Sequence, residues 1–114
     1  MPFTPRLVLV TASSVDEARK LTKGIIEHHL AACVNIIPGV ESHYVWKGEL
    51  RKDAEVLMLI KSSAEEFETL AGYIRKHHSY ECPEIMTIPP KEISPGYRSW
   101  WDEVMMQESE KVYG

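Results

Sequence analysis

Two groups of histidine and cysteine in this sequence combine side chains that bind copper and zinc. The groups have the same internal spacing and lie 49 residues apart (82 minus 33): His28, His29 and Cys33, then His77, His78 and Cys82. The spacing matches no closed metal motif. Histidines in the last turn of a helix also complement its dipole, so a ligand set and a structural helix end both remain open.

A second concentration of reactive side chains occupies residues 78–84. Seven residues there supply an imidazole, a phenol, a thiol and two carboxylates: His78, Tyr80, Glu81, Cys82 and Glu84. Such variety exceeds what a connecting loop needs, and binding residues are often carried on loops. A solvated loop is the alternative explanation for the two carboxylates.

Familiar catalytic patterns are absent from the sequence. It contains no glycine-rich phosphate loop, no His-Glu-x-x-His motif and no serine in an elbow motif, so we expect a protein that is not an enzyme and has no organic cofactor. The formal net charge of −4 disfavours nucleic acid as a partner. The apolar run at residues 7–10 is too short for a signal or a membrane span, so we expect no membrane insertion and a cytoplasmic location.

Apolar periodicity along the 114 residues predicts one domain, residues 1–114, with the element order βαββαβ and a further helix. The strands are predicted at residues 6–12, 33–47, 49–61 and 85–88, and the helices begin at capping boxes, residues 14–17 and 63–66, and at residues 94–95. This order predicts an α+β, ferredoxin-like split βαβ fold: a four-stranded antiparallel sheet with helices on one face, a long hairpin between the second and third strands, and an extra C-terminal helix. Residues 107–114 are expected to fray.

This topology places the two His-His-Cys groups at opposite ends of the subunit, because the helices that carry them run in opposite directions. They cannot enclose one ion within a chain, and a Cys33–Cys82 disulfide is implausible because bridged Cα atoms lie within roughly 7 Å. A complete metal site therefore needs groups from a second subunit or from other ligands.

The predicted hairpin is too long for its own subunit. Strands of this length reach about 45 to 50 Å, whereas a helix of about 16 residues covers only about 24 Å. The overhanging residues 40–54 include Val45, Trp46 and Leu50 and are too apolar for a free two-stranded ribbon. We expect another copy to cover them; the alternative is a hairpin that folds back over its own sheet at Pro38-Gly39.

Several stretches resemble, in order and spacing, the motifs of the CutA divalent-cation-tolerance family. They are residues 30–36 (LAACVNI), residues 44–48 (YVWKG), Glu55 with Lys61, residues 78–84 (HSYECPE) and residues 97–100 (YRSW). The resemblance covers nearly the whole chain. One departure is Ser79, which stands where the family usually has the proline of a His-Pro-Tyr motif, so we expect a less rigid turn around His78.

The resemblance implies a homotrimer, packed through the long hairpins and sheet edges, with a role in tolerance of copper and other divalent cations. Cys33 and His78 stand at the positions of the family's proposed ligands for Cu(II) or another divalent cation. An inter-subunit cleft is expected at Trp46, Glu55, Lys61, Tyr80, Glu81 and Glu84. The alternative is a trimeric signalling or scaffold module, similar to the PII regulators, whose inter-subunit clefts bind a small anion or a partner protein.

Overall fold

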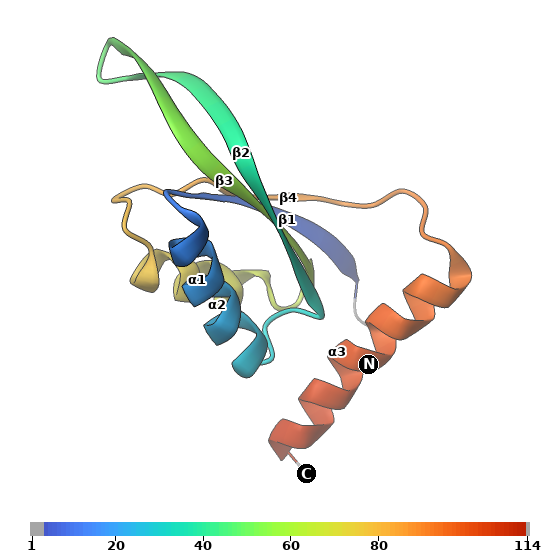
Figure 1. Cartoon of the computed structure of the whole chain (residues 1–114). Coiled ribbons are helices and arrows are strands. Elements are labelled where there is room, and N and C mark those ends of the chain that lie inside the picture. The colour runs from blue at the N-terminus through green and yellow to red at the C-terminus, as the bar shows by residue number, and fades with distance from the viewer. Residues whose placement is uncertain (1–3, 114) are drawn as a thin grey trace.

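The computed structural model describes residues 4–113, with the side chains of residues 4–106. The elements follow in the order β1 (Pro5–Ala12), α1 (Val15–Glu27), β2 (Cys33–Trp46), β3 (Glu49–Ser63), α2 (Phe67–His77), β4 (Ile85–Ile88) and α3 (Pro95–Tyr113). The strands form one antiparallel sheet in the order β2-β3-β1-β4, with α1 and α2 side by side over one face (Figure 1). The predicted fold class is confirmed.

The core lies between this face of the sheet and the two helices. Every second residue of the central strands is buried there, including Val8 and Val10 of β1 and Met58 and Ile60 of β3. Alternation of this kind follows from the two-residue period of a strand. The helices contribute a stripe that is also buried: Ala18, Leu21 and Ile25 of α1, and Leu70, Ala71 and Ile74 of α2.

The two predicted capping boxes form only in part. Ser14 is the N-cap of α1, and its hydroxyl accepts from the Glu17 amide at 3.1 Å. The Glu17 carboxylate does not return to Ser14 but accepts from Ser13. In the second box Ser63 Oγ accepts from the Glu66 amide, yet residues 64–66 form a turn and α2 begins at Phe67, so the predicted start of this helix was early.

The β2–β3 hairpin projects beyond the helices and does not fold back over the sheet (Figure 1). Its two-residue turn uses Lys47 and Gly48, both at positive φ (51° and 78°), as the turns preferred in hairpins require. The register shifts between Ile37 and Val40, at the predicted Pro38-Gly39 interruption. The projecting part leaves Val45 64% and Leu50 89% exposed in the single chain.

The last helix packs against the outer face of the sheet, opposite α1 and α2. Trp101 is buried and its indole N–H donates to the Ser62 carbonyl at 3.0 Å. The Lys61 ammonium lies 5.6 Å from the centroid of the Tyr97 ring. Trp100 remains partly exposed. The side chains beyond residue 106 and all of residue 114 lie outside the described part, so the predicted fraying of residues 107–114 stays a prediction.

Helices α1 and α2 approach closely at Gly24. A Cβ at this position would lie 1.6 Å from the Tyr73 hydroxyl and 2.5 Å from its Cζ. The Tyr73 ring is held between two imidazoles, with centroids 5.3 Å from His28 and 4.3 Å from His77. His28 donates its Nδ1–H to the Gly24 carbonyl at 2.8 Å, so this histidine serves the end of the helix. The glycine therefore makes room for the tyrosine.

We expect Gly24→Ala to lower the free energy of unfolding by about 1–2 kcal/mol, because overpacking outweighs the helix-propensity gain of about 1 kcal/mol. Chemical denaturation at fixed protein concentration measures the change. In a Tyr73→Ala background the same substitution should instead stabilise the protein. A Gly24→Ala single variant more stable than the parent would contradict the packing argument.

Candidate functional site

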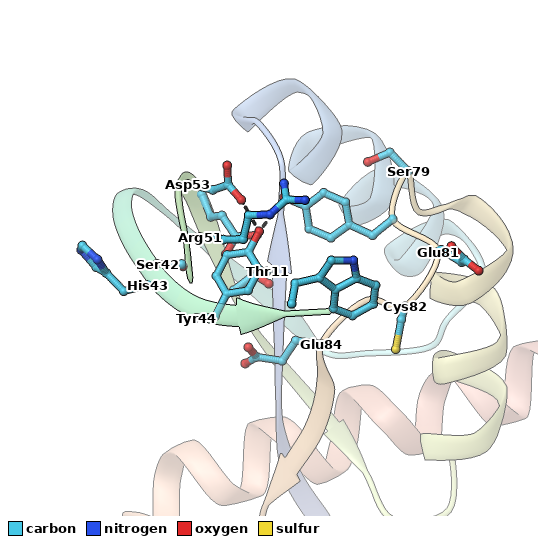
Figure 2. A pocket seen from close by; sticks show the side chains of 13 residues that line it. Thr11, Ser42, His43, Tyr44, Arg51, Asp53, Ser79, Glu81, Cys82 and Glu84 are labelled. Carbon is cyan, nitrogen blue, oxygen red and sulfur yellow. Dashed lines mark hydrogen bonds between the residues drawn. The ribbon is translucent and has the colours of Figure 1, made fainter. Parts of the chain in front are cut away.

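A cleft of about 730 Å³ lies between the projecting hairpin and the loop that joins α2 to β4. Figure 2 shows its walls, with Tyr44, Arg51 and Asp53 from the hairpin on one side and Glu81 and Cys82 from the loop on the other. The complete lining is Thr11, Ser42, His43, Tyr44, Trp46, Arg51, Asp53, Glu55, Ser79, Tyr80, Glu81, Cys82 and Glu84. We call it the hairpin cleft.

Strand alternation puts the polar residues of the hairpin cleft on the outer face of the sheet. Val56 and Met58 of β3 face the helices and are buried, so Glu55 and Asp53 point to the opposite face. On the neighbouring strand Ser42 is paired with Asp53 in the register that follows the bulge. The bulge thus decides which β2 side chains join the cleft.

Two phenol–carboxylate pairs lie in the hairpin cleft, one within the hairpin and one between the loop and β3. Tyr44 donates its hydroxyl to Asp53, and Tyr80 donates to Glu55 at 2.8 Å. The bond to Asp53 raises the pKa of Tyr44. Burial, and then the hydrogen bond to Glu55, raises the pKa of Tyr80 far above its ordinary value of 10.0. Both phenols are therefore protonated near neutral pH, and each fixes its ring against a carboxylate.

His78 connects the loop between α2 and β4 to the sheet. Its side chain has no exposed surface. Nε2–H donates to the Thr11 carbonyl at 2.8 Å, and Nδ1 accepts from the Tyr80 amide at 3.0 Å, a pattern that requires the neutral tautomer protonated on Nε2. The imidazole therefore joins the loop to the end of β1. To bind a metal, as the sequence predicts, the ring would have to give up one of these two bonds.

The Glu17 carboxylate secures the same loop from α1. Oε1 accepts from the Ser13 amide at 2.9 Å and hydroxyl at 2.8 Å, and Oε2 accepts from the Ser79 amide at 2.7 Å. Burial raises the pKa of this carboxyl, but the hydrogen bonds from Ser13 and Ser79 outweigh it and lower the pKa to about 2. The carboxylate is thus ionised and fully occupied near neutral pH.

Ser79 supplies a bond that proline could not. Its amide N–H is the donor to Glu17, and a proline at this position has no N–H. This hydrogen bond restrains the turn in a way that proline could not, and the expectation of a less rigid turn stays a prediction.

The two predicted metal ligands lie at opposite ends of the sheet. Cys33 is paired across β2 and β3 with Lys61, which is paired in turn with Leu7, whereas His78 contacts Thr11. Leu7 and Thr11 are four residues apart on β1, about 13 Å. Both cysteines are free thiols. Within the described residues, no three His, Cys, Asp or Glu side chains form a group that could hold a metal ion.

Five of the six residues predicted for an inter-subunit cleft line this cleft, which lies within one chain: Trp46, Glu55, Tyr80, Glu81 and Glu84. Lys61 does not. It lies at the other end of β3, where its ammonium donates to Asn35 and sits over Tyr97. The sequence did not predict Asp53 as a cleft residue, because its contact with Tyr44 depends on the register between β2 and β3. The sequence did not predict the contact of Glu17 with the loop, because a capping box already accounted for this residue.

The fold and the cleft define a class of small α+β proteins with a ferredoxin-like sheet, a hairpin that projects beyond the helices and a polar site beside that hairpin. The sequence matches the CutA1 divalent ion tolerance protein family over residues 6–104, and the chain belongs to that family. The divalent-cation tolerance protein CutA of Thermus thermophilus is 40% identical over 97 residues, which are 85% of this chain and 94% of that protein.

Solved structures agree with this assignment. The chain superposes on the Thermus thermophilus divalent cation tolerance protein with a TM-score of 0.84 and 39% identity, covering 87% of this chain and 96% of that one. The periplasmic divalent cation tolerance protein CutA from Archaeoglobus fulgidus gives a TM-score of 0.84 at 33% identity, covering 89% and 98% of the two chains.

Relatives from animals are longer. The CutA homolog of Xenopus laevis is 38% identical over 96 residues, which are 84% of this chain but 64% of that protein. Between residues 4 and 113, no helix has both the length and the apolar run needed to cross a membrane. The Archaeoglobus relative is named as periplasmic, so the cytoplasmic location stays a prediction.

We expect Glu17→Gln to destabilise the protein by about 1–2 kcal/mol at pH 7, after allowance for solvent screening, because glutamine has one acceptor oxygen and cannot accept from both Ser13 and Ser79. The folded-state pKa of Glu17 is lowered from 4.5 to about 2, so its stabilisation is present above pH 4.5 and is lost as pH falls toward 2. Denaturation of both proteins between pH 7 and pH 2 should show the difference shrinking in that window. A difference that is constant with pH would contradict this role.

Proposed function

We propose that this protein is a homotrimer that binds divalent cations, copper in particular, at a site completed between subunits, and that it acts in metal-ion tolerance without catalysing a reaction. The observation that carries the proposal is the family match over residues 6–104. The relatives' names speak of tolerance, and the assembly and the metal are our inference for this chain.

The exposed hairpin supports assembly. Val45 and Leu50 are paired across the hairpin and form an apolar surface on one face of a ribbon that no other described element covers. Two-stranded ribbons are marginal in water, and a contiguous apolar surface of this kind is typical of interfaces. The outer face of β4 adds Met86 and Ile88, which are exposed at the edge of the sheet.

The arrangement of donor atoms favours a shared metal site. Cys33 is a half-buried free thiol on the outer face of the sheet, and thiolate suits Cu(I) and Zn(II). The described part of one chain brings no two further donors to it. A second subunit would have to supply them, either from His78 after a change in its hydrogen bonds or from exposed carboxylates.

We expect Leu50→Glu to shift the assembly toward smaller species, because a charge would enter the covered surface. Light scattering coupled to size exclusion at micromolar concentration would show a trimer for the parent and dissociation for the variant. Ile26→Glu is the matched control, since Ile26 is an exposed apolar residue of α1 away from the hairpin. A monomeric parent would overturn the proposed assembly.

We expect Cys33→Ala to weaken Cu or Zn binding at least about tenfold, or about 1.4 kcal/mol, because it removes the thiolate. Anaerobic calorimetric titration with Cu(II) and with Zn(II), without added reductant, and elemental analysis of the purified protein measure this. Cys82→Ala is the control, since it removes the other thiol and leaves Cys33 intact. Equal binding by the parent and the Cys33 variant would exclude this ligand, and a trimer without metal affinity would favour the scaffold alternative.

A further inference from the structure

We propose that the hairpin cleft binds a small organic ammonium ion between its aromatic rings and its carboxylates. This site is separate from the metal site proposed at Cys33 and does not depend on it. The chemistry expected of the ligand is a primary or quaternary alkylammonium group carried on a short aliphatic chain.

Aromatic rings come from both walls of the cleft. Tyr44 and Trp46 stand at alternate positions of β2 and share a face, whereas Tyr80 belongs to the opposing loop. Ring faces attract ammonium groups through their quadrupole, and tryptophan and tyrosine do so most strongly. Rings on two sides of one space are the arrangement that recognises alkylammonium ions.

The rings are held in place before any ligand arrives. Each phenol donates to a carboxylate of β3, Tyr44 to Asp53 and Tyr80 to Glu55. These bonds also occupy the two hydroxyl protons, so the phenols present oxygen lone pairs and ring faces to the cleft rather than donors for an anion. Preorganisation of this kind lowers the entropy cost of binding.

The charge of the cleft selects a cation. Four carboxylates line it, from Asp53, Glu55, Glu81 and Glu84, against one guanidinium, from Arg51. Figure 2 shows these side chains around the space, with Asp53 at the upper left, Glu84 below and Glu81 on the right. The field of this lining repels a small anion, which counts against the anion-binding alternative for this cleft.

The spacing of the carboxylates favours an organic cation over a metal ion. Ca²⁺ or Mg²⁺ needs several oxygens within about 2.0–2.6 Å of one point. No three donor side chains in the described residues converge in that way, and Asp53 and Glu55 already accept from phenols. An alkylammonium ion spreads its charge over N–H or C–H groups several ångströms apart. A space of about 730 Å³ also suits a molecule rather than a single ion.

The test is a titration of the assembled protein with 1,4-diaminobutane and with tetramethylammonium chloride, followed by the indole N–H resonances in ¹⁵N-correlated NMR spectra. The chain has three tryptophans, and a Trp46→Phe variant identifies the cleft resonance. We expect a saturable shift of the Trp46 signal, with those of Trp100 and Trp101 unmoved. Sodium chloride at equal ionic strength and sodium acetate should produce no such shift.

Charge-removing variants test the carboxylates. We expect Glu84→Gln to weaken binding about fivefold, whereas Glu92→Gln, an exposed carboxylate outside the cleft, leaves it unchanged. Light scattering confirms that both variants keep the parent's subunit number. The proposal is overturned if the ammonium probes give no saturable shift, if sodium chloride reproduces it, or if Glu84→Gln binds like the parent. Cys33→Ala should retain ammonium binding, so the two proposals can fail separately.

Discussion

Glu17 joins the start of α1 to the loop that follows α2, 62 residues further along the chain. One carboxylate oxygen accepts from Ser13 at the start of α1, and the other accepts from Ser79 after α2. The neighbouring His78 ring binds the Thr11 carbonyl at the end of β1. Together with the bond from Tyr80 to Glu55, these bonds hold the loop against the sheet, and without them the hairpin cleft would lose one wall. The cleft therefore depends on a helix-terminal carboxylate that lies outside it.

The other wall is positioned by the hairpin, and one hydrogen bond connects the two. Tyr80 follows the loop's turn at His78 and donates to Glu55 on β3, just where the strand leaves the covered part of the sheet. Burial and that carboxylate keep the phenol protonated by raising its pKa. A substitution at Glu17 would therefore affect β3 through the hydrogen bond between Tyr80 and Glu55. Each step of this path is a direct contact.

The elements of the fold were predictable because local patterns determine them. The short run at residues 85–88, which ends before Pro89-Pro90, predicted β4, and Ser94-Pro95 predicted the start of α3, as observed. The site was harder to predict from the sequence, because it depends on pairing between segments. Lys61 shares a strand face with Glu55, but six residues, about 20 Å, separate them, and sequence alone does not say which end of the face a cleft uses. The Tyr44–Asp53 pair likewise follows from a bulge-shifted register.

The two His-His-Cys groups differ in structure because the backbone adopts different conformations at His29 and at His78. After α1, His29 adopts φ 60°, and the amides of His29 and Leu30 return to the Ile26 and Ile25 carbonyls, which closes the helix and leads into β2 within a few residues. After α2, the matching His78 is extended, at φ −81° and ψ 146°. Two segments with the same His-His-Cys spacing thus differ in backbone conformation, so that one ends in a compact turn and the other leads into the loop that lines the cleft.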